Sequence, residues 1–209
     1  MVLVKSPPSR IAFYCDTPAA SGGETSVLLS GALYRRVAAA RPAFTARLAA
    51  EGLVYRRVLS EADDAASAQG RGWRSTYAAA SRAEAEDAMR ATGVHAWEWL
   101  PCGGLRTETA ALPAFLDDPR SGERLFHNAL AAIYLGWNDA RNRGPDSVRF
   151  GGGQPLEEAD VRAVAAVMDE LAVNVPWQKG DVMLLDNRRA MHARRPFTPP
   201  RRVLAYICE

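Results

Sequence analysis

The stretch from Trp177 to Arg202, WQKGDVMLLDNRRAMHARRPFTPPRR, decides how the rest of the chain is interpreted. Its apolar run Val182 to Leu185 is typical of a β-strand, and the polar sequence that follows this run is typical of a turn. One histidine, His192, comes after the turn, and arginines stand on both sides of it. A histidine among arginines close to a strand makes this segment the first candidate for a functional site.

Outward from this segment, short strand-like runs alternate with a few helices. We expect two short helices after Ser30, which we interpret as an N-cap, and Pro42 divides them. Further helices are expected over Ser81 to Thr92, which opens with capping-box spacing, and over Leu156 to Val173. The expected strands are Ile11 to Cys15, one starting near Glu24, Leu53 to Leu59, Val94 to Leu100, Leu105 to Ala110, Leu112 to Leu116, Val182 to Leu185 and Arg202 to Cys208. This pattern indicates a mainly β fold, a sandwich or jelly roll with helical insertions.

The composition is that of an ordinary globular protein. Of the 209 residues 48% are hydrophobic, and 26 Lys and Arg stand against 24 Asp and Glu. We therefore expect one domain over residues 1–209, and a net charge of +2 is too small to indicate a nucleic-acid or membrane partner. No apolar run approaches the roughly 20 residues that cross a bilayer. The absence of a secretory signal and the odd number of 3 cysteines favour a cytoplasmic setting without disulfides.

The segment from Trp177 onward resembles the C-terminal signature of the Fe(II)- and 2-oxoglutarate-dependent dioxygenases of the taurine dioxygenase (TauD/TfdA) and clavaminate synthase-like family, W-x-x-GD-x-x-x-x-DN followed by H-x-R. Residues 13–25, FYCDTPAASGGET, resemble an upstream block of the same family. Matches between the two blocks follow the family's order, so the resemblance covers nearly the whole chain. They are Gly72-Trp73, Trp99, Leu105 to Thr107, Gly122-Glu123, Phe126, Asn128 and Gly151 to Gly153.

This resemblance implies a fold and a reaction. The fold would be a double-stranded β-helix (jelly-roll) core with helical insertions. The cofactor would be Fe(II) and the co-substrate 2-oxoglutarate, which is decarboxylated to succinate while a C–H bond of a small-molecule substrate is oxidised, for example hydroxylated. The identity of that substrate does not follow from the sequence, because specificity in such folds resides in loops and insertions.

The resemblance also assigns roles to individual residues. An iron of this kind is held by two histidines and one carboxylate, and the far carboxylate of 2-oxoglutarate is bound by an arginine with help from a hydroxyl group. By resemblance, His192 is the distal metal ligand, Arg202 binds that carboxylate and Thr25 supplies the hydroxyl. Arg201 is the alternative to Arg202, because side chains alternate across a strand and only one of two adjacent arginines can point into the barrel.

Three further residues of the signature have supporting interpretations. Arg194 matches the arginine of H-x-R, although Ala193 replaces the usual glycine, and we expect Arg194 near the metal site without contacting the metal. Asp186 and Asn187 match the Asp-Asn pair. Because such side chains bond their own local backbone, we expect them to shape the turn that brings His192 into position.

Simpler interpretations remain open for several of these features. Trp73 and Trp99 could line a substrate cavity, although tryptophans in a mixed α/β domain more often belong to the core. The arginines between 188 and 202 could in part form a solvated basic face. Serine or cysteine hydrolases are disfavoured, since no G-x-S-x-G motif or Cys-His signature is present.

One part of the family pattern is missing. In the family, the other two metal ligands come as His-x-Asp or His-x-Glu shortly before the strand that matches Ile11 to Cys15. The histidines here, His95, His127 and His192, are followed two residues later by Trp, Ala and Arg, so the sequence contains no such motif. We favour the explanation that Met1 is an internal methionine of a longer product and that the chain is N-terminally truncated. The other explanation is a natural short form that has lost its metal.

With either explanation, we expect this chain alone to bind iron poorly and to have low stability, because a partial barrel exposes strand edges. Two functions are therefore weighed. The first is an Fe(II)/2-oxoglutarate-dependent oxygenase. The alternative is a non-catalytic remnant that binds a carboxylate ligand or a protein partner with the same arginines. The oligomeric state does not follow from the sequence.

Overall fold

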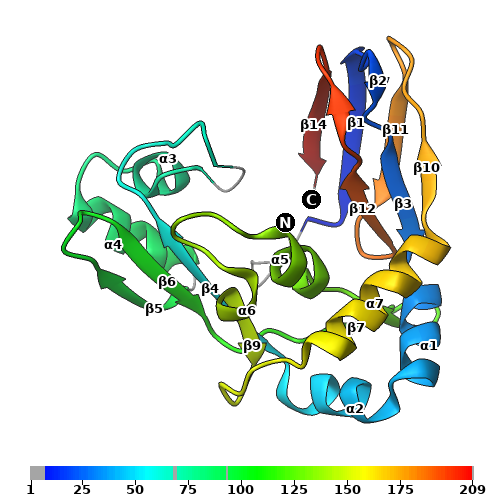
Figure 1. The fold of residues 1–209 in the computed structure, drawn as a ribbon, viewed down its shortest axis with the longest axis horizontal. Coiled ribbons are helices and arrows are strands. Elements are labelled where there is room, and N and C mark those ends of the chain that lie inside the picture. The colour runs from blue at the N-terminus through cyan, green and yellow to red at the C-terminus, as the bar shows by residue number, and fades with distance from the viewer. Residues whose placement is uncertain (1–7, 68–69, 93, 209) are drawn as a thin grey trace. The chain divides into compact units, whose positions relative to one another are not determined.

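The computed structural model describes residues 8–67, 70–92 and 94–208. Contacts between residues divide the chain into two compact units (Figure 1). The first unit comprises Ala43–Ala114 and Asn128–Arg162, and the second comprises residues 8–42, Phe115–His127 and 163–208. Because this division does not test whether the units fold independently, the expectation of a single domain stays a prediction.

The first unit is built around a four-stranded antiparallel sheet with the order β5-β6-β4-β9. Its elements are α2 (Pro42–Glu51), β4 (Leu53–Leu59), α3 (Trp73–Tyr77), α4 (Arg82–Thr92), β5 (Val94–Trp99), β6 (Leu105–Thr109), α5 (Leu130–Gly136), α6 (Gly144–Ser147) and β9 (Val148–Phe150). The start of α4 follows from its sequence, since the backbone N–H of Glu84 donates to Oγ of Ser81 at 3.3 Å and the Glu84 carboxylate accepts from the N–H of Ala80.

The two tryptophans of the first unit pack with its core. Trp73 is 1% exposed among residues such as Leu59, Met89 and Leu105, and its indole N–H donates to the carbonyl of Gly103 at 3.1 Å. Trp99 meets the Trp73 ring edge-on with the ring centres 5.1 Å apart. Both tryptophans therefore have the structural role that their residue type favours.

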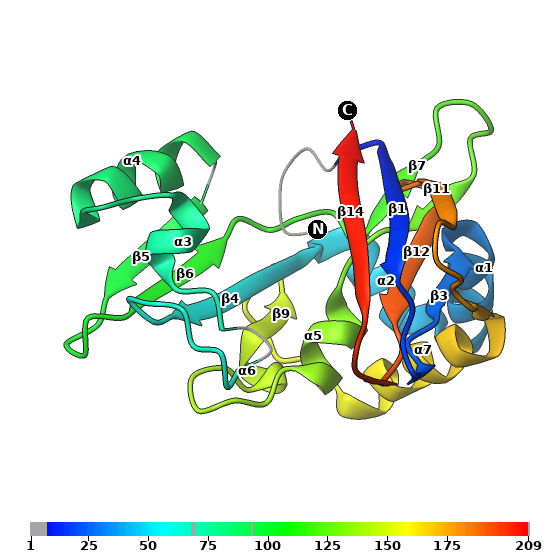
Figure 2. The same cartoon turned by 90° about the horizontal axis from the view of Figure 1, so that it is seen from above.

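The second unit contains two three-stranded antiparallel sheets, β11-β1-β14 and β10-β3-β12. Its elements are β1 (Arg10–Thr17), β2 (Ser21–Gly22), β3 (Thr25–Leu29), α1 (Ser30–Ala40), β7 (Phe115–Asp117), β8 (Arg124–Phe126), most of α7 (Glu158–Leu171), β10 (Val173–Val175), β11 (Val182–Asp186), β12 (Ala190–Arg194), β13 (Phe197–Thr198) and β14 (Arg202–Cys208). Strands β1 and β14, far apart in the sequence, run side by side in both views (Figure 1, Figure 2). The fold is mainly β with helices, as expected, and a complete jelly roll stays a prediction.

The structure corrects some expected boundaries. Ser30 is not an N-cap: it is the first residue of α1, and Leu29 precedes the helix without a side-chain cap. The physical reason is that β3 runs directly into α1, so the cap position falls on Leu29, the last residue of the strand. The Ser30 backbone N–H continues the contact with the neighbouring segment by donating to the carbonyl of Arg189 at 2.8 Å. The strand expected over Leu112 to Leu116 is also shorter, because Leu112 forms only an isolated bridge with Leu53. Pro42 does separate α1 from α2, as expected for a residue that has no backbone N–H to donate within a helix.

The helix expected over Leu156 to Val173 is observed over Glu158–Leu171, and Val173 begins the separate strand β10. Among the residues that the structure describes, none of the helices is both long enough and apolar enough to cross a membrane.

Candidate functional site

Three of the residues singled out in the sequence share one face of the β10-β3-β12 sheet. His192 lies on β12 directly opposite Val27 of β3, and Arg194 lies opposite Thr25. Because alternate residues of a strand project to the same face, these four side chains are on one side of the sheet. Phe13, from β1 of the other sheet, meets the His192 ring edge-on with the ring centres 5.1 Å apart. The shared face is therefore turned toward the β11-β1-β14 sheet.

His192 is partly buried on this face. Its Nδ1 atom is buried and has no hydrogen-bond partner among the described residues. Burial lowers the pKa of His192 from its ordinary value, which favours the neutral ring at neutral pH. A neutral imidazole with an unengaged nitrogen is the form that ligates a metal ion. The chemistry of this side chain therefore suits the role of a metal ligand, and that role stays a prediction.

Thr25 is 5% exposed, and its Oγ1 accepts a hydrogen bond of 3.0 Å from the indole N–H of Trp177. A hydroxyl group has one donor and two acceptor positions, so this bond leaves the Thr25 hydroxyl hydrogen available for an acceptor. Such a hydrogen can be donated to a carboxylate. The sequence does not predict the Trp177 contact, because the two residues are separated by 152 positions.

The two adjacent arginines point differently, as the alternation of side chains predicts. Arg202 has a side chain that is 68% exposed and lies 3.6 Å from the carboxylate of Asp16. Arg201 is partly buried, and its Nε donates to the carbonyl of Gly23 at 2.9 Å. Burial lowers the pKa of the Arg201 guanidinium, and the positive charge of Arg194 lowers it further. Arg201 is therefore the more buried of the two arginines, and it is the one whose pKa is affected by the charge of Arg194.

Alternation along β14 accounts for this outcome, because Arg201 takes the same side as Val203, whose partner Cys15 is buried, and Arg202 takes the other side. Val203 of β14 pairs with Cys15, whereas Arg202 pairs with Thr17, so β1 has one extra residue at this point. This bulge lies on β1 and leaves the alternation of side chains along β14 unchanged. The geometry thus favours Arg201, the alternative, over Arg202 as the inward arginine. Which of them binds 2-oxoglutarate is not tested by this geometry and stays a prediction.

Gly23 allows Arg201 to take this position. Its φ is +75°, a left-handed conformation that glycine adopts without steric cost. A Cβ atom on Gly23 would lie 2.9 Å from Cβ of Ala19 and 3.0 Å from Cδ of Arg201. The absence of a side chain at Gly23 is therefore a condition for the observed Arg201 contact.

The turn before β12 is held by the expected Asp-Asn pair. The Asp186 carboxylate accepts hydrogen bonds from the backbone N–H groups of Arg188 at 3.1 Å and Arg189 at 3.4 Å. Asn187 is buried and its Nδ2 donates to the carbonyl of Pro8 at 2.9 Å. These bonds close the turn between β11 and β12 and join it to the start of β1, which fixes where β12 begins.

The hairpin formed by β7 and β8 contacts the same turn. The sequence did not predict these contacts. Asp118, only 3% exposed, follows β7 and lies 3.3 Å from Nε of Arg189. Arg120 donates to the Asp186 carboxylate at 2.5 Å. Hydrogen bonding from the Arg120 backbone N–H, followed by that of Ser121 and the charge of Arg189, lowers the pKa of Asp118. The β7–β8 hairpin therefore anchors the turn that precedes His192.

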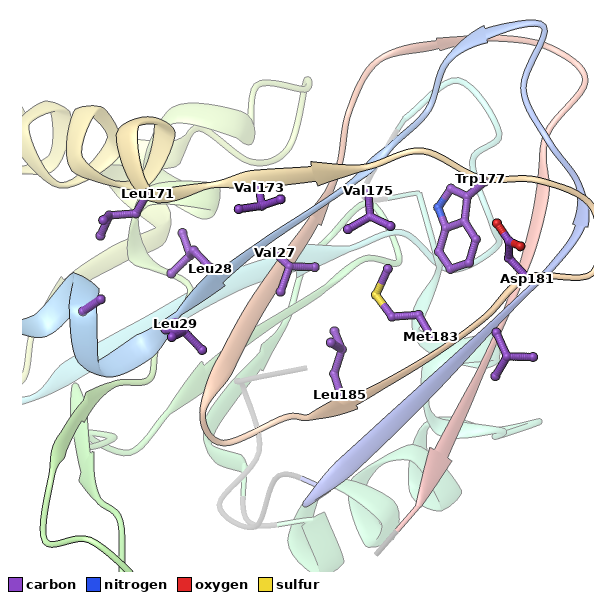
Figure 3. Close-up of a pocket in the computed structure, with 12 residues that line it drawn as sticks. Val27, Leu28, Leu29, Leu171, Val173, Val175, Trp177, Asp181, Met183 and Leu185 are labelled. Atoms are coloured by element: carbon purple, nitrogen blue, oxygen red, sulfur yellow. The ribbon is translucent and has the colours of Figure 1, made fainter.

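An apolar cavity of about 630 Å³ opens beside this face (Figure 3). Val27 and Val175 point into it from one sheet, and Met183 and Leu185 point into it from the other (Figure 3). Its full lining is Val27, Leu28, Leu29, Ala32, Leu171, Val173, Val175, Trp177, Asp181, Val182, Met183 and Leu185. Because Val27 is the strand neighbour of His192, the cavity adjoins the candidate site.

Iron does not fit the residues that the structure describes. Over residues 8–67, 70–92 and 94–208, no group of three His, Cys, Asp or Glu side chains is arranged to hold a metal ion. A facial iron site needs two histidines and a carboxylate. His192, on the candidate face, is one residue of the type that such a set needs. The roles of Arg201 and Thr25 in binding an anion, and of His192 in binding a metal ion, stay predictions.

Residues 2–207 match the family model "Taurine catabolism dioxygenase TauD, TfdA family", so the chain belongs to the TauD/TfdA family. Within that family it resembles a clavaminate synthase-like protein of Arabidopsis thaliana, with 41% identity over 209 residues, which is 100% of this chain and 63% of that protein. It also resembles the dapdiamide synthesis protein DdaC of Enterobacter agglomerans, with 23% identity over 207 residues, 94% of this chain and 60% of that protein. The chain thus spans less than two thirds of the length of these relatives.

A solved structure shares the fold. It is an asparagine oxygenase in complex with Fe(II), 2S,3S-3-hydroxyasparagine and succinate, with a TM-score of 0.54 and 17% identity over 99% of this chain and 47% of that one. At this identity the likeness concerns the fold alone. The earlier resemblance to the TauD/TfdA family, drawn from two sequence blocks, is confirmed by the family match.

Proposed function

We propose that this chain acts as part of an Fe(II)/2-oxoglutarate-dependent oxygenase that oxidises a C–H bond of a small molecule while 2-oxoglutarate is converted to succinate and CO2. The observation that carries the proposal is the placement of Thr25 and His192 on one face, with Arg201 partly buried in the same unit. Membership of the TauD/TfdA family supports it. So does the bound succinate named for the asparagine oxygenase that shares the fold.

The chain's own residues would bind and orient the co-substrate. The Arg201 guanidinium would form a paired hydrogen bond with the far carboxylate of 2-oxoglutarate, because its planar donors match a carboxylate. Thr25, whose Oγ1 already accepts a bond from Trp177, would donate its hydroxyl hydrogen to the same carboxylate. Trp177, which lines the apolar cavity and contacts Thr25, would keep water away from the Thr25 hydroxyl, which strengthens such a bond. Arg202 remains the alternative for this role.

No catalytic step is assigned to this chain, because the described residues do not provide a complete iron site. His192 would serve as one ligand. The remaining ligands and the activity of the longer relatives belong to the proposal. A second function is favoured by this same observation: a protein that binds a carboxylate ligand through Arg201 and Thr25 without catalysis.

The first experiment is a titration of 2-oxoglutarate into the metal-free chain by calorimetry, with Arg201→Lys and Arg202→Lys as a matched pair of variants. We expect binding to the unaltered chain and at least a tenfold loss for Arg201→Lys, because lysine cannot reproduce the paired contact. A larger loss for Arg202→Lys would transfer the role to that residue. An absence of binding to the unaltered chain would contradict both proposed functions.

A second experiment separates the two functions. Fe(II) is titrated anaerobically with 2-oxoglutarate present, and the visible charge-transfer band of the chelate is followed. The chain is compared with a version extended by the sequence encoded directly upstream of Met1. A band in either form supports the oxygenase. If 2-oxoglutarate binds and neither form gives the band, the non-catalytic function is the correct one.

A further inference from the structure

Two pairs of adjacent arginines stand on either side of β13, Arg194 with Arg195 and Arg201 with Arg202. In each pair one arginine has an acidic partner, since Arg195 and Arg202 lie 3.2 Å and 3.6 Å from an aspartate carboxylate. Within the described part of the chain, no carboxylate lies at ion-pair distance from Arg194 or Arg201. The second unit therefore carries two positive charges here that an anion would balance.

The ring of Phe197 on β13 contacts both of these arginines. The guanidinium carbon of Arg194 lies over the ring at 5.1 Å from its centre, and that of Arg201 lies over it at 5.6 Å. Aromatic rings attract cations over distances of up to roughly 6 Å. The charge of Arg194 lowers the pKa of Arg201, so the two guanidinium groups are close enough to repel each other. A ring that both groups share offsets part of this repulsion.

Phe197 and Arg201 are held by the same short segment of the chain. Phe197 pairs with Gly22 of β2. The backbone N–H of Gly23 donates to the carbonyl of Pro196 at 2.9 Å, which fixes the chain directly before the ring. The carbonyl of Gly23 in turn accepts a hydrogen bond of 2.9 Å from Nε of Arg201. The ring and the guanidinium group are therefore placed against each other through the backbone of two successive glycines.

The donors of Arg201 that remain suit a carboxylate. Its Nε is engaged with Gly23, whereas its two terminal Nη groups form no hydrogen bond with the residues that the structure describes. Two donors on one planar group match the two oxygens of a carboxylate. A guanidinium group that is fixed in advance binds such a partner with a smaller loss of conformational freedom. The contacts that orient Arg201 therefore affect how strongly it binds an anion.

We propose that Phe197 is a positioning residue, which holds the Arg201 guanidinium with its two terminal groups directed to the far carboxylate of 2-oxoglutarate and keeps Arg194 beside it as a second positive charge. The inference rests on the proposed function, because Phe197 acts through Arg201 and has no chemical role of its own. The role requires the aromatic ring and not only an apolar side chain of similar size, since the face of the ring attracts the cations.

The test measures the affinity of the metal-free chain for 2-oxoglutarate by calorimetry. Phe197→Leu keeps an apolar side chain and removes the ring, and we expect an affinity about two- to fivefold lower, as for the loss of a ring–cation contact at a partly exposed site. Phe197→Tyr keeps the ring and should bind as tightly as the unaltered chain. In an Arg201→Gln background, Phe197→Leu should cause a smaller loss, because the ring no longer has that cation to hold.

Trp97→Leu is the matched control. Trp97 is also partly exposed, and the guanidinium carbon of Arg90 lies over its ring at 5.4 Å from the centre, but both residues belong to the first unit. This variant removes a ring–arginine contact of the same kind and should leave the affinity for 2-oxoglutarate unchanged. Circular dichroism shows whether each variant is folded.

A second measurement does not depend on 2-oxoglutarate. The NMR signals of the Nε–H groups of Arg194 and Arg201 sense a nearby ring, so in the ligand-free chain they should shift in Phe197→Leu and stay near their original positions in Phe197→Tyr. If the unaltered chain binds no 2-oxoglutarate, the proposed function fails, and these signals alone decide whether Phe197 holds Arg201. Unchanged signals in Phe197→Leu, an undiminished affinity of that variant, an equal loss in the Arg201→Gln background, or a folded Phe197→Tyr that binds as weakly as Phe197→Leu would each overturn the inference.

Discussion

Substitution of Gly23 by alanine tests whether the backbone at this position determines the placement of Arg201. The new Cβ would meet Cβ of Ala19 at 2.9 Å and Cδ of Arg201 at 3.0 Å. A left-handed φ costs a residue with a Cβ about 1–2 kcal/mol relative to glycine. The Arg201 side chain would also have to move, which weakens its bond to the Gly23 carbonyl. Loss of one such bond adds about 1 kcal/mol.

Gly122→Ala is the control that separates these two contributions. Gly122 has a φ of +69°, close to the +75° of Gly23, and a Cβ there would meet no atom within 4 Å. We therefore expect Gly122→Ala to lose only the backbone contribution of about 1–2 kcal/mol. Gly23→Ala should lose about 2–3 kcal/mol, the sum of both contributions. Urea denaturation followed by circular dichroism measures both losses.

Binding provides the sharper readout. Gly23→Ala should weaken the binding of 2-oxoglutarate to the metal-free chain, because Arg201 is displaced, whereas Gly122→Ala should leave it unchanged. Equal free energies of unfolding for the two variants, together with equal affinities, would refute the argument that Gly23 positions Arg201. A loss of affinity in both variants would instead indicate a general loosening of the second unit.

Three further outcomes are expected. Leu105→Ala should lower the free energy of unfolding by about 2–5 kcal/mol, since Leu105 is fully buried in the core of the first unit, and a loss below 1 kcal/mol in urea denaturation would contradict this. Asn187→Ala should lose about 1 kcal/mol through the bond to Pro8, which thermal unfolding can detect. Trp99→Phe should destabilise the chain more at pH 7 than at pH 3. The Trp99 indole N–H holds the pKa of Glu86 below its ordinary value, so this stabilisation is complete above about pH 4.3 and is lost as the pH falls through the lowered pKa. Equal destabilisation of Trp99→Phe at both pH values would exclude the Glu86 contribution.

Local sequence was sufficient where the physical cause is local. The capping box at the start of α4 is realised by bonds between residues three or four positions apart. The break between α1 and α2 comes from Pro42, which cannot continue a helix. The Asp-Asn turn before β12 closes through bonds from Asp186 to the next residues. The match to the TauD/TfdA family was also readable from two sequence blocks.

The sequence alone thus determined the family, several element boundaries and the identity of the candidate residues. Tertiary structure decided how those residues are placed. Arg201 is the inward arginine because it falls on the same side of β14 as Val203, whose partner Cys15 on the distant strand β1 is buried. Ser30 does not cap α1, because β3 runs directly into the helix and the cap position falls on Leu29. Contacts of this kind join distant segments, and residue patterns report only on near neighbours, so no local signal could have predicted them.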